Sequence, residues 1–238
     1  MKKSIIIFFL SIISSSNAQF RRGTFSKDPI LNYENWDKQR LYFGFFLGFN
    51  AYDFKIDYKK LDPKTDIEVN SQVGFSVGLV ADLRISEYFN LRFEPGLYNC
   101  QRDLTYSNPL FISNRDKIRE VKSTYLNFPL LLKYSALRVG NVKPYLLGGV
   151  STTYNLGSNE TLLDDNSSGR FRVKAFTYNY ELGFGIDFYL EYFKFSPSIR
   201  GVFGLNNELV YDKDPNSQWT SNISALNNRA IFINFTFH

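Results

Sequence analysis

Apolar and polar side chains alternate along several stretches of this chain with a period of two residues. In the clearest stretch, 176–188, every second residue is Phe, Tyr, Leu or Ile, and the residues between them are Thr, Asn, Glu, Gly and Asp. Such alternation places one kind of side chain on each face of a β-strand. A tilted strand crosses a bilayer in about 9 to 11 residues, so this stretch is long enough to span a membrane.

Seven other stretches complete a regular series. A glycine-interrupted stretch, 142–154, has faces that the pattern does not assign, and the other six are 43–51, 73–83, 91–98, 126–134, 193–200 and 229–238. Short turns near 86–90, 136–141 and 189–192 alternate with long polar connections at 57–71, 101–120, 157–172 and 206–228. Outer-membrane barrels have short periplasmic turns and longer extracellular loops. We therefore predict an all-β fold, an eight-stranded antiparallel transmembrane β-barrel with both termini in the periplasm.

The N-terminus has the pattern of a secretory signal peptide. Lys2 and Lys3 precede the apolar stretch 5–13, and small or polar residues follow as far as Ala18. The apolar stretch is shorter than the roughly 20 residues of a transmembrane helix. We predict a signal peptide at 1–18, a polar periplasmic extension at 19–40 and the barrel at 41–238.

Two barrels of opposite polarity fit eight strands. A lipocalin encloses an apolar interior, whereas an outer-membrane barrel presents apolar side chains to lipid and encloses polar ones. Here one face carries large aromatic side chains and the other combines glycine with charge, and burial of unpaired ions in an apolar core costs several kcal/mol each. We therefore predict that the charges form a network within a narrow, filled lumen. Its predicted members are Asp82, Arg92, Glu94, Lys133, Glu181, Asp187 and Arg200.

Composition agrees with an exported β-protein. Aromatic residues make up 18% of the chain, and the formal net charge is +5, which approaches balance once Lys2 and Lys3 are removed with the signal peptide. The remaining charges are scattered, so we expect no nucleic-acid partner. Cys100 is the only cysteine, which excludes an internal disulfide and favours a buried, inert thiol.

The sequence offers few residues that could carry out catalysis or hold a cofactor. Glu94 with Glu181, or Asp82 with Asp187, would be the carboxylate pairs available for acid–base work, but a luminal ion-pair network explains them better. His238 is the only histidine, so neither a histidine-based triad nor a metal cluster is expected. We expect no enzymatic activity, no cofactor and no small-molecule substrate.

The two tryptophans are candidate partner or interface anchors. Trp36 lies in the predicted extension and Trp219 in a predicted long connection. Tryptophan is enriched both at membrane interfaces and among the residues that dominate protein contacts, so either role remains open.

Several segments together resemble one family. They are Leu41–Ile56 (LYFGFFLGFNAYDFKI), Tyr125–Tyr134 (YLNFPLLLKY), Pro144–Gly149 (PYLLGG), Glu181–Tyr189 (ELGFGIDFY) and Tyr192–Pro197 (YFKFSP) with the downstream Gly204–Asn206. In this combination and order they are similar to the PorT family, outer-membrane barrels of the type IX secretion system and gliding motility in Bacteroidetes. The likeness extends over nearly all of the predicted mature chain.

The resemblance implies a non-enzymatic component of protein export across the outer membrane, with a separate giant barrel as the conduit. Its implied partners are outer-membrane lipid and other secretion-system components. Two alternatives from other classes remain open: a small-solute or ion channel, and a structural or adhesive surface barrel.

Overall fold

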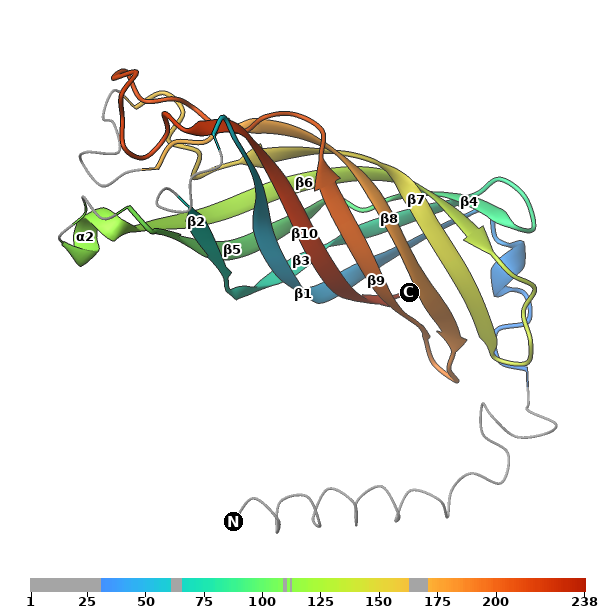
Figure 1. Cartoon of the computed structure of the whole chain (residues 1–238). Coiled ribbons are helices and arrows are strands. Elements are labelled where there is room, and N and C mark those ends of the chain that lie inside the picture. The colour runs from blue at the N-terminus through green and yellow to red at the C-terminus, as the bar shows by residue number, and fades with distance from the viewer. Residues whose placement is uncertain (1–30, 61–65, 109–110, 112, 163–170) are drawn as a thin grey trace, which may run out of the picture.

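A computed structural model describes residues 31–60, 66–108, 111, 113–162 and 171–238 (Figure 1). The predicted signal peptide and the first part of the predicted extension lie outside these residues. The strands are β1 (Leu41–Tyr58), β2 (Ile67–Ser71), β3 (Val73–Arg84), β4 (Phe89–Phe93), β5 (Gly96–Tyr106), β6 (Ile118–Ser135), β7 (Val142–Asn155), β8 (Phe176–Tyr189), β9 (Lys194–Gly204) and β10 (Ile223–Phe237). Two short helices, η2 (Trp36–Lys38) and α2 (Asn114–Lys117), lie outside the sheet. Among the described residues, no helix is long and apolar enough to cross a bilayer.

The strands close into a ring. Each strand pairs antiparallel with its neighbours, and β1 closes the ring by pairing with both β10 and β3. The ten segments make eight passes, because β2 continues into β3 across Gln72 and β4 continues into β5 across Glu94 and Pro95. Proline has no N–H to donate to a ladder, which explains the second interruption. The predicted eight-stranded antiparallel barrel is confirmed.

The two ends of the barrel differ. One end, called here the short-turn end, carries the connections β3–β4, β6–β7 and β8–β9, together with the start of β1 and the end of β10. The opposite end carries four longer connections and is called the long-loop end (Figure 1). Segment 31–40, blue in Figure 1, lies beside the short-turn end.

Outward-facing side chains form a continuous apolar belt. Phe43 is 69% exposed and Leu79 is 66% exposed, whereas Arg92 and Glu181 on the inner face are 0% exposed. On β7, whose faces the sequence left unassigned, Leu146 and Val150 point outward. The distribution of side chains is therefore the inverse of that in a soluble protein, with apolar residues outside and charges inside.

Several strands are longer than the sequence predicted. β6 begins at Ile118 rather than 126, and parts of β2, β5 and β10 occupy the predicted connections 57–71, 101–120 and 206–228. These boundary predictions were wrong because the outward side chains there are polar. Asp103 and Glu120, for example, pair across β5 and β6, so the backbone ladder continues after the apolar alternation has ended.

Candidate functional site

An ion-pair network crosses the lumen near the short-turn end. Arg92 on β4 binds Asp82 on β3, with 2.9 Å between Nη2 and Oδ2. Lys133 on β6 and Lys194 on β9 both bind the Oδ2 atom of Asp187 on β8, at 2.6 and 3.0 Å. All five side chains are essentially inaccessible to solvent. Buried ions are tolerated when each has a partner of opposite charge and good geometry.

A second group continues the network toward the middle of the barrel. Glu94 accepts from Arg92 at 3.1 Å and from Arg200 at 2.7 Å, using one carboxylate oxygen for each. Arg200 also lies 2.9 Å from Glu181, measured from Nε to Oε2, and Asn127 donates to the other Glu181 oxygen at 3.1 Å. The seven charged residues singled out in the sequence thus all take part in ion pairs. Glu94 links the Asp82–Arg92 pair to the Arg200–Glu181 pair, whereas Asp187 binds Lys133 and Lys194 in a separate set.

Three further charged residues of the lumen, Lys194, Arg102 and Glu208, were not among those predicted from the sequence. Lys194 lies on the same polar face of its strand as Arg200, so the alternation was sufficient to find it. Arg102 and Glu208 lie in stretches that were predicted to be connections. Arg102 continues the even-numbered inward face of β5 beyond the predicted end of that strand. Glu208 lies between β9 and β10, where no periodicity marks the direction of a side chain.

Arg102 forms a third layer, nearer the long-loop end. Its guanidinium group donates to the Asn228 side chain at 3.0 Å and to the Tyr125 hydroxyl, and it lies 3.8 Å from the centre of the Phe54 ring. Glu208, in the β9–β10 connection, is fully buried near Arg102. Burial raises the pKa of the Glu208 carboxyl to about 7, although the positive charge of Arg102 opposes that shift.

An apolar cluster covers the lumen at the long-loop end. Its buried members come from strand ends and from the connections, and they are Phe54, Ile67, Leu104, Tyr106, Phe111, Val121, Phe171, Val173, Leu209, Ile223 and Leu226. Trp219 packs against this cluster: its ring stacks on Phe111 at 5.3 Å, its indole N–H donates to the Asp116 carbonyl, and Arg119 lies 5.0 Å from the ring centre. The Trp219 side chain therefore makes intramolecular contacts.

Trp36 lies at the opposite end of the molecule. Its ring stacks on Tyr42 at 5.8 Å, and the neighbouring Asp37 accepts a hydrogen bond from the Tyr189 hydroxyl at 2.6 Å. Lys143 lies 3.7 Å from the same carboxylate. Segment 31–40 is thus attached to β1, β7 and β8 at the short-turn end.

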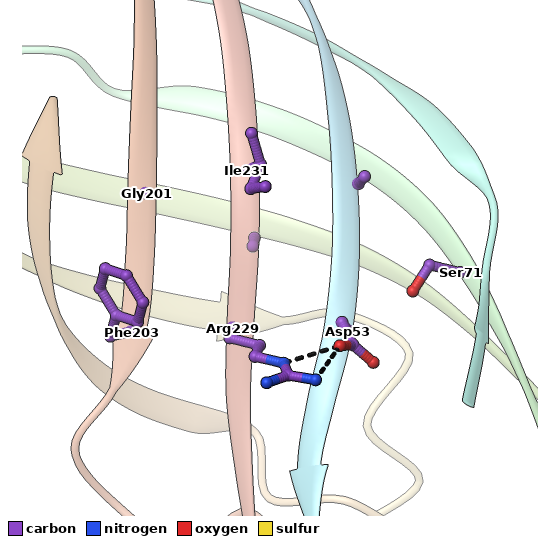
Figure 2. A pocket seen from close by; sticks show the side chains of 8 residues that line it. Asp53, Ser71, Gly201, Phe203, Arg229 and Ile231 are labelled. Atoms are coloured by element: carbon purple, nitrogen blue, oxygen red, sulfur yellow. Dashed lines mark hydrogen bonds and ion pairs between the residues drawn. The ribbon is translucent and has the colours of Figure 1, made fainter. Parts of the chain in front are cut away.

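The barrel wall separates between β1 and β2. The β1–β3 ladder ends at the pair Ala51 and Val73, and beyond it β2 pairs with β5. Within the described residues, no ladder pair joins β1 to β2. Figure 2 shows Asp53 and Ser71 on opposite sides of this separation. They line an outer groove of about 430 Å³ together with Ile231 and the exposed Arg229, which is ion-paired with Asp53.

The four carboxylates predicted for the luminal network are all engaged in ion pairs. Asp82, Glu94, Glu181 and Asp187 each form at least one ion pair. In the described part of the chain, no group of three or more His, Cys, Asp or Glu side chains is arranged to hold a metal ion. Burial and the adjacent Lys194 lower the pKa of the terminal His238 to about 3, so its imidazole is neutral at ordinary pH.

A comparison with models of protein families agrees with this architecture. A family model described as "Outer membrane protein beta-barrel domain" matches residues 17–210. The solved outer membrane protein OprG from Pseudomonas aeruginosa is 15% identical, with a TM-score of 0.46 over 83% of this chain and 93% of OprG. Neisserial surface protein A (NspA) is 11% identical, with a TM-score of 0.44 over 83% of this chain and 98% of NspA.

A third solved structure, the N-terminal β-barrel domain of Pseudomonas aeruginosa OprF, is 14% identical, with a TM-score of 0.32 over 81% of this chain and 97% of that domain. No curated protein matches the chain. The family model covers most of the sequence, and the ring of antiparallel strands with its apolar outer belt has the architecture that the model describes. The chain belongs to the family of outer membrane protein beta-barrel domains.

Proposed function

We propose that this protein is a closed, non-enzymatic outer-membrane barrel that assists the type IX secretion machinery through its two ends rather than through its lumen. One observation carries the closed state: Arg92, Arg102, Arg200 and Lys133 are buried inside the barrel. Their ion pairs and ring contacts span the interior at three successive levels, and the apolar cluster covers the long-loop end. A lumen filled in this way by the described side chains favours a closed barrel over an open channel.

The export role rests on the resemblance of the barrel segments to the PorT family. A filled barrel fits that role, because an accessory component leaves transport to a separate conduit. In the proposed orientation the short-turn end and both termini face the periplasm, since short turns are typical of that side. Segment 31–40 and the long loops then lie on opposite sides of the membrane, where other secretion-system components and outer-membrane lipid are the proposed partners.

The export role is tested by deletion and complementation in the native host. We expect the deletion strain to retain type IX cargo inside the cell and the wild-type gene to restore its export. A host that releases cargo normally after the deletion would refute the secretion role. Crosslinking in intact cells followed by mass spectrometry would identify the components that contact each end.

The closed state is tested separately by conductance. Purified protein inserted into a planar bilayer should give no steady single-channel current. A stable current would favour the alternative function of a small-solute or ion channel. In that case a neutral substitution such as Arg200→Gln should change ion selectivity, because Arg200 would line the path.

The second alternative, an adhesive surface barrel, is tested by deleting the long loops. If loop deletions spare secretion and abolish surface binding, the protein is an adhesive surface barrel.

A further inference from the structure

Three cationic side chains line one pocket at the short-turn end. Lys38, Arg40 and Arg84 surround a cavity of about 530 Å³, which is completed by Leu83, Ile85, Ser86 and Glu87. Lys38 and Arg40 come from the segment before the barrel, whereas the other residues come from the end of β3 and the turn that follows it. The pocket therefore exists only where segment 31–40 lies against the barrel.

Backbone contacts hold the three cations together. The N–H of Arg84 donates to the carbonyl of Arg40 at 2.8 Å. One extended residue, Gln39, separates Lys38 from Arg40. On the other side of this segment, Trp36 stacks on Tyr42, and Asp37 is bound by Tyr189 and Lys143. The pocket is thus attached to the barrel at several points.

The positive charge of the pocket is not neutralised within the described residues. None of the three cations lies within 4.0 Å of a described carboxylate, although six luminal ion pairs form elsewhere in the barrel. Lys38 donates to the Asn35 side chain at 2.9 Å and Arg84 donates to the Ser86 carbonyl at 3.3 Å. Glu87 is the only acidic residue in the lining. The pocket retains a net positive charge and free N–H donors.

The position of the pocket favours an anion that also carries apolar groups. It lies at the edge of the apolar belt, where Ile85 is 61% exposed and Leu83 and Phe89 face outward. A molecule at this edge meets apolar side chains on one side and cations on the other. Arginine and lysine near a membrane surface attract anionic lipids, and guanidinium groups pair closely with phosphate oxygens.

We propose that Lys38, Arg40 and Arg84 form a binding site for the headgroup phosphate of an anionic phospholipid in the adjacent leaflet. The acyl chains of that lipid lie along Leu83, Ile85 and Phe89, and the headgroup occupies the pocket. The bound lipid links segment 31–40 to the membrane.

The site is tested on the purified full-length protein in a nonionic detergent, with phosphatidylglycerol as the probe and native mass spectrometry as the readout. Replacing all three cations by glutamine should weaken binding by roughly 100-fold, and each single replacement by about fivefold. Lys122→Gln is the control, because Lys122 is an exposed cation near the long-loop end of β6, at the opposite end of the barrel from the pocket, and it should leave affinity unchanged. Retention of the folded, heat-modifiable band on gels shows that each variant still forms the barrel.

Two further measurements sharpen the test. Trp36→Ala leaves every cation in place but removes the stack on Tyr42, so it should weaken phosphatidylglycerol binding if the attachment of segment 31–40 builds the site. Phosphatidylcholine, which has no net charge, should bind at least tenfold more weakly than phosphatidylglycerol. The proposal fails if the triple variant binds as tightly as wild type, if the two lipids bind equally, or if millimolar inorganic phosphate displaces phosphatidylglycerol completely.

Discussion

Glu94 accepts a hydrogen bond from Arg200 across the full width of the lumen, with 2.7 Å between Oε2 and Nη1. The two residues are far apart in sequence, and their passes lie on opposite sides of the ring. Arg92 binds the other oxygen of the same carboxylate. A single carboxylate therefore joins the Asp82–Arg92 pair to the Arg200–Glu181 pair and connects opposite walls of the barrel.

Replacing Glu94 by Ala should destabilise the barrel strongly. The change leaves Asp82 as the carboxylate partner of Arg92 and Glu181 as the carboxylate partner of Arg200. Breaking a buried ion pair costs about 3–5 kcal/mol. The free energy of unfolding in urea, measured on protein in detergent micelles, reports the loss. Glu94→Gln retains the shape and some hydrogen bonds, so it should cost less. A loss below about 1 kcal/mol for Glu94→Ala would show that the network is not needed for stability.

Two glycine substitutions should differ in their effect on stability, because one glycine faces the crowded lumen and the other faces the open outer surface. A Cβ added at Gly78 would clash with the Phe46 ring and lie 2.5 Å from the Pro95 carbonyl oxygen. Gly78→Ala should therefore lose about 1–3 kcal/mol. At Gly148 the added Cβ would meet only a Leu182 methyl group at 3.4 Å, so Gly148→Ala should be neutral or slightly stabilising. Equal urea midpoints for the two variants would contradict this difference.

The alternation of apolar and polar residues predicted most of the fold because the lipid-facing belt imposes it on every strand. The run 176–188 became β8 with little change in its limits. The strand extensions beyond the belt were missed, since water accepts polar side chains such as Lys122 on the outer face while the backbone ladder continues unchanged. A strand can therefore be longer than its stretch of alternating apolar and polar residues, and only the alternation is visible in the sequence.

The candidate site was likewise predictable only in part. Asp82 and Arg92 were predictable as inward-facing because they alternate with belt residues, and the antiparallel register makes them direct partners. Which carboxylate joins which cation across the lumen depends on strand tilt and rotamer, so the link from Glu94 to Arg200 was not predictable. Glu208 reaches the lumen from a connection, where no periodicity fixes the direction of a side chain.

The separation of β1 from β2 should be visible in hydrogen exchange. Residues 45–51 of β1 pair on both sides, whereas residues beyond Ala51 pair only with β10. Amides in 54–58 that face the separation should therefore exchange faster than those in 45–51. The Tyr58 hydroxyl accepts the Ile67 N–H at 3.0 Å and donates to Asp66 at 2.9 Å, so Tyr58→Phe should accelerate exchange at Ile67. Uniform protection along β1 would show that the separation closes in solution.

Stability should fall as the pH rises through the range in which Glu208 ionises. Its pKa is about 7 in the folded barrel and 4.5 in its ordinary state, so the unfolded chain releases this proton first and folding favours the protonated form. The contribution of Glu208 is fully favourable below pH 4.5, is lost progressively as the pH rises through 7, and totals on the order of 3 kcal/mol.

Glu208→Gln removes the ionisation while keeping the size of the side chain. The variant should match wild type at pH 4 and be more stable at pH 8, because it does not bury a carboxylate. Urea unfolding at a series of pH values in micelles measures the difference. Glu68→Gln is a suitable control, since Glu68 is an exposed carboxylate on β2, and this variant should keep the fall in stability between pH 4 and pH 8. A profile that is the same for wild type and Glu208→Gln would place the Glu208 carboxylate in water rather than beside Arg102.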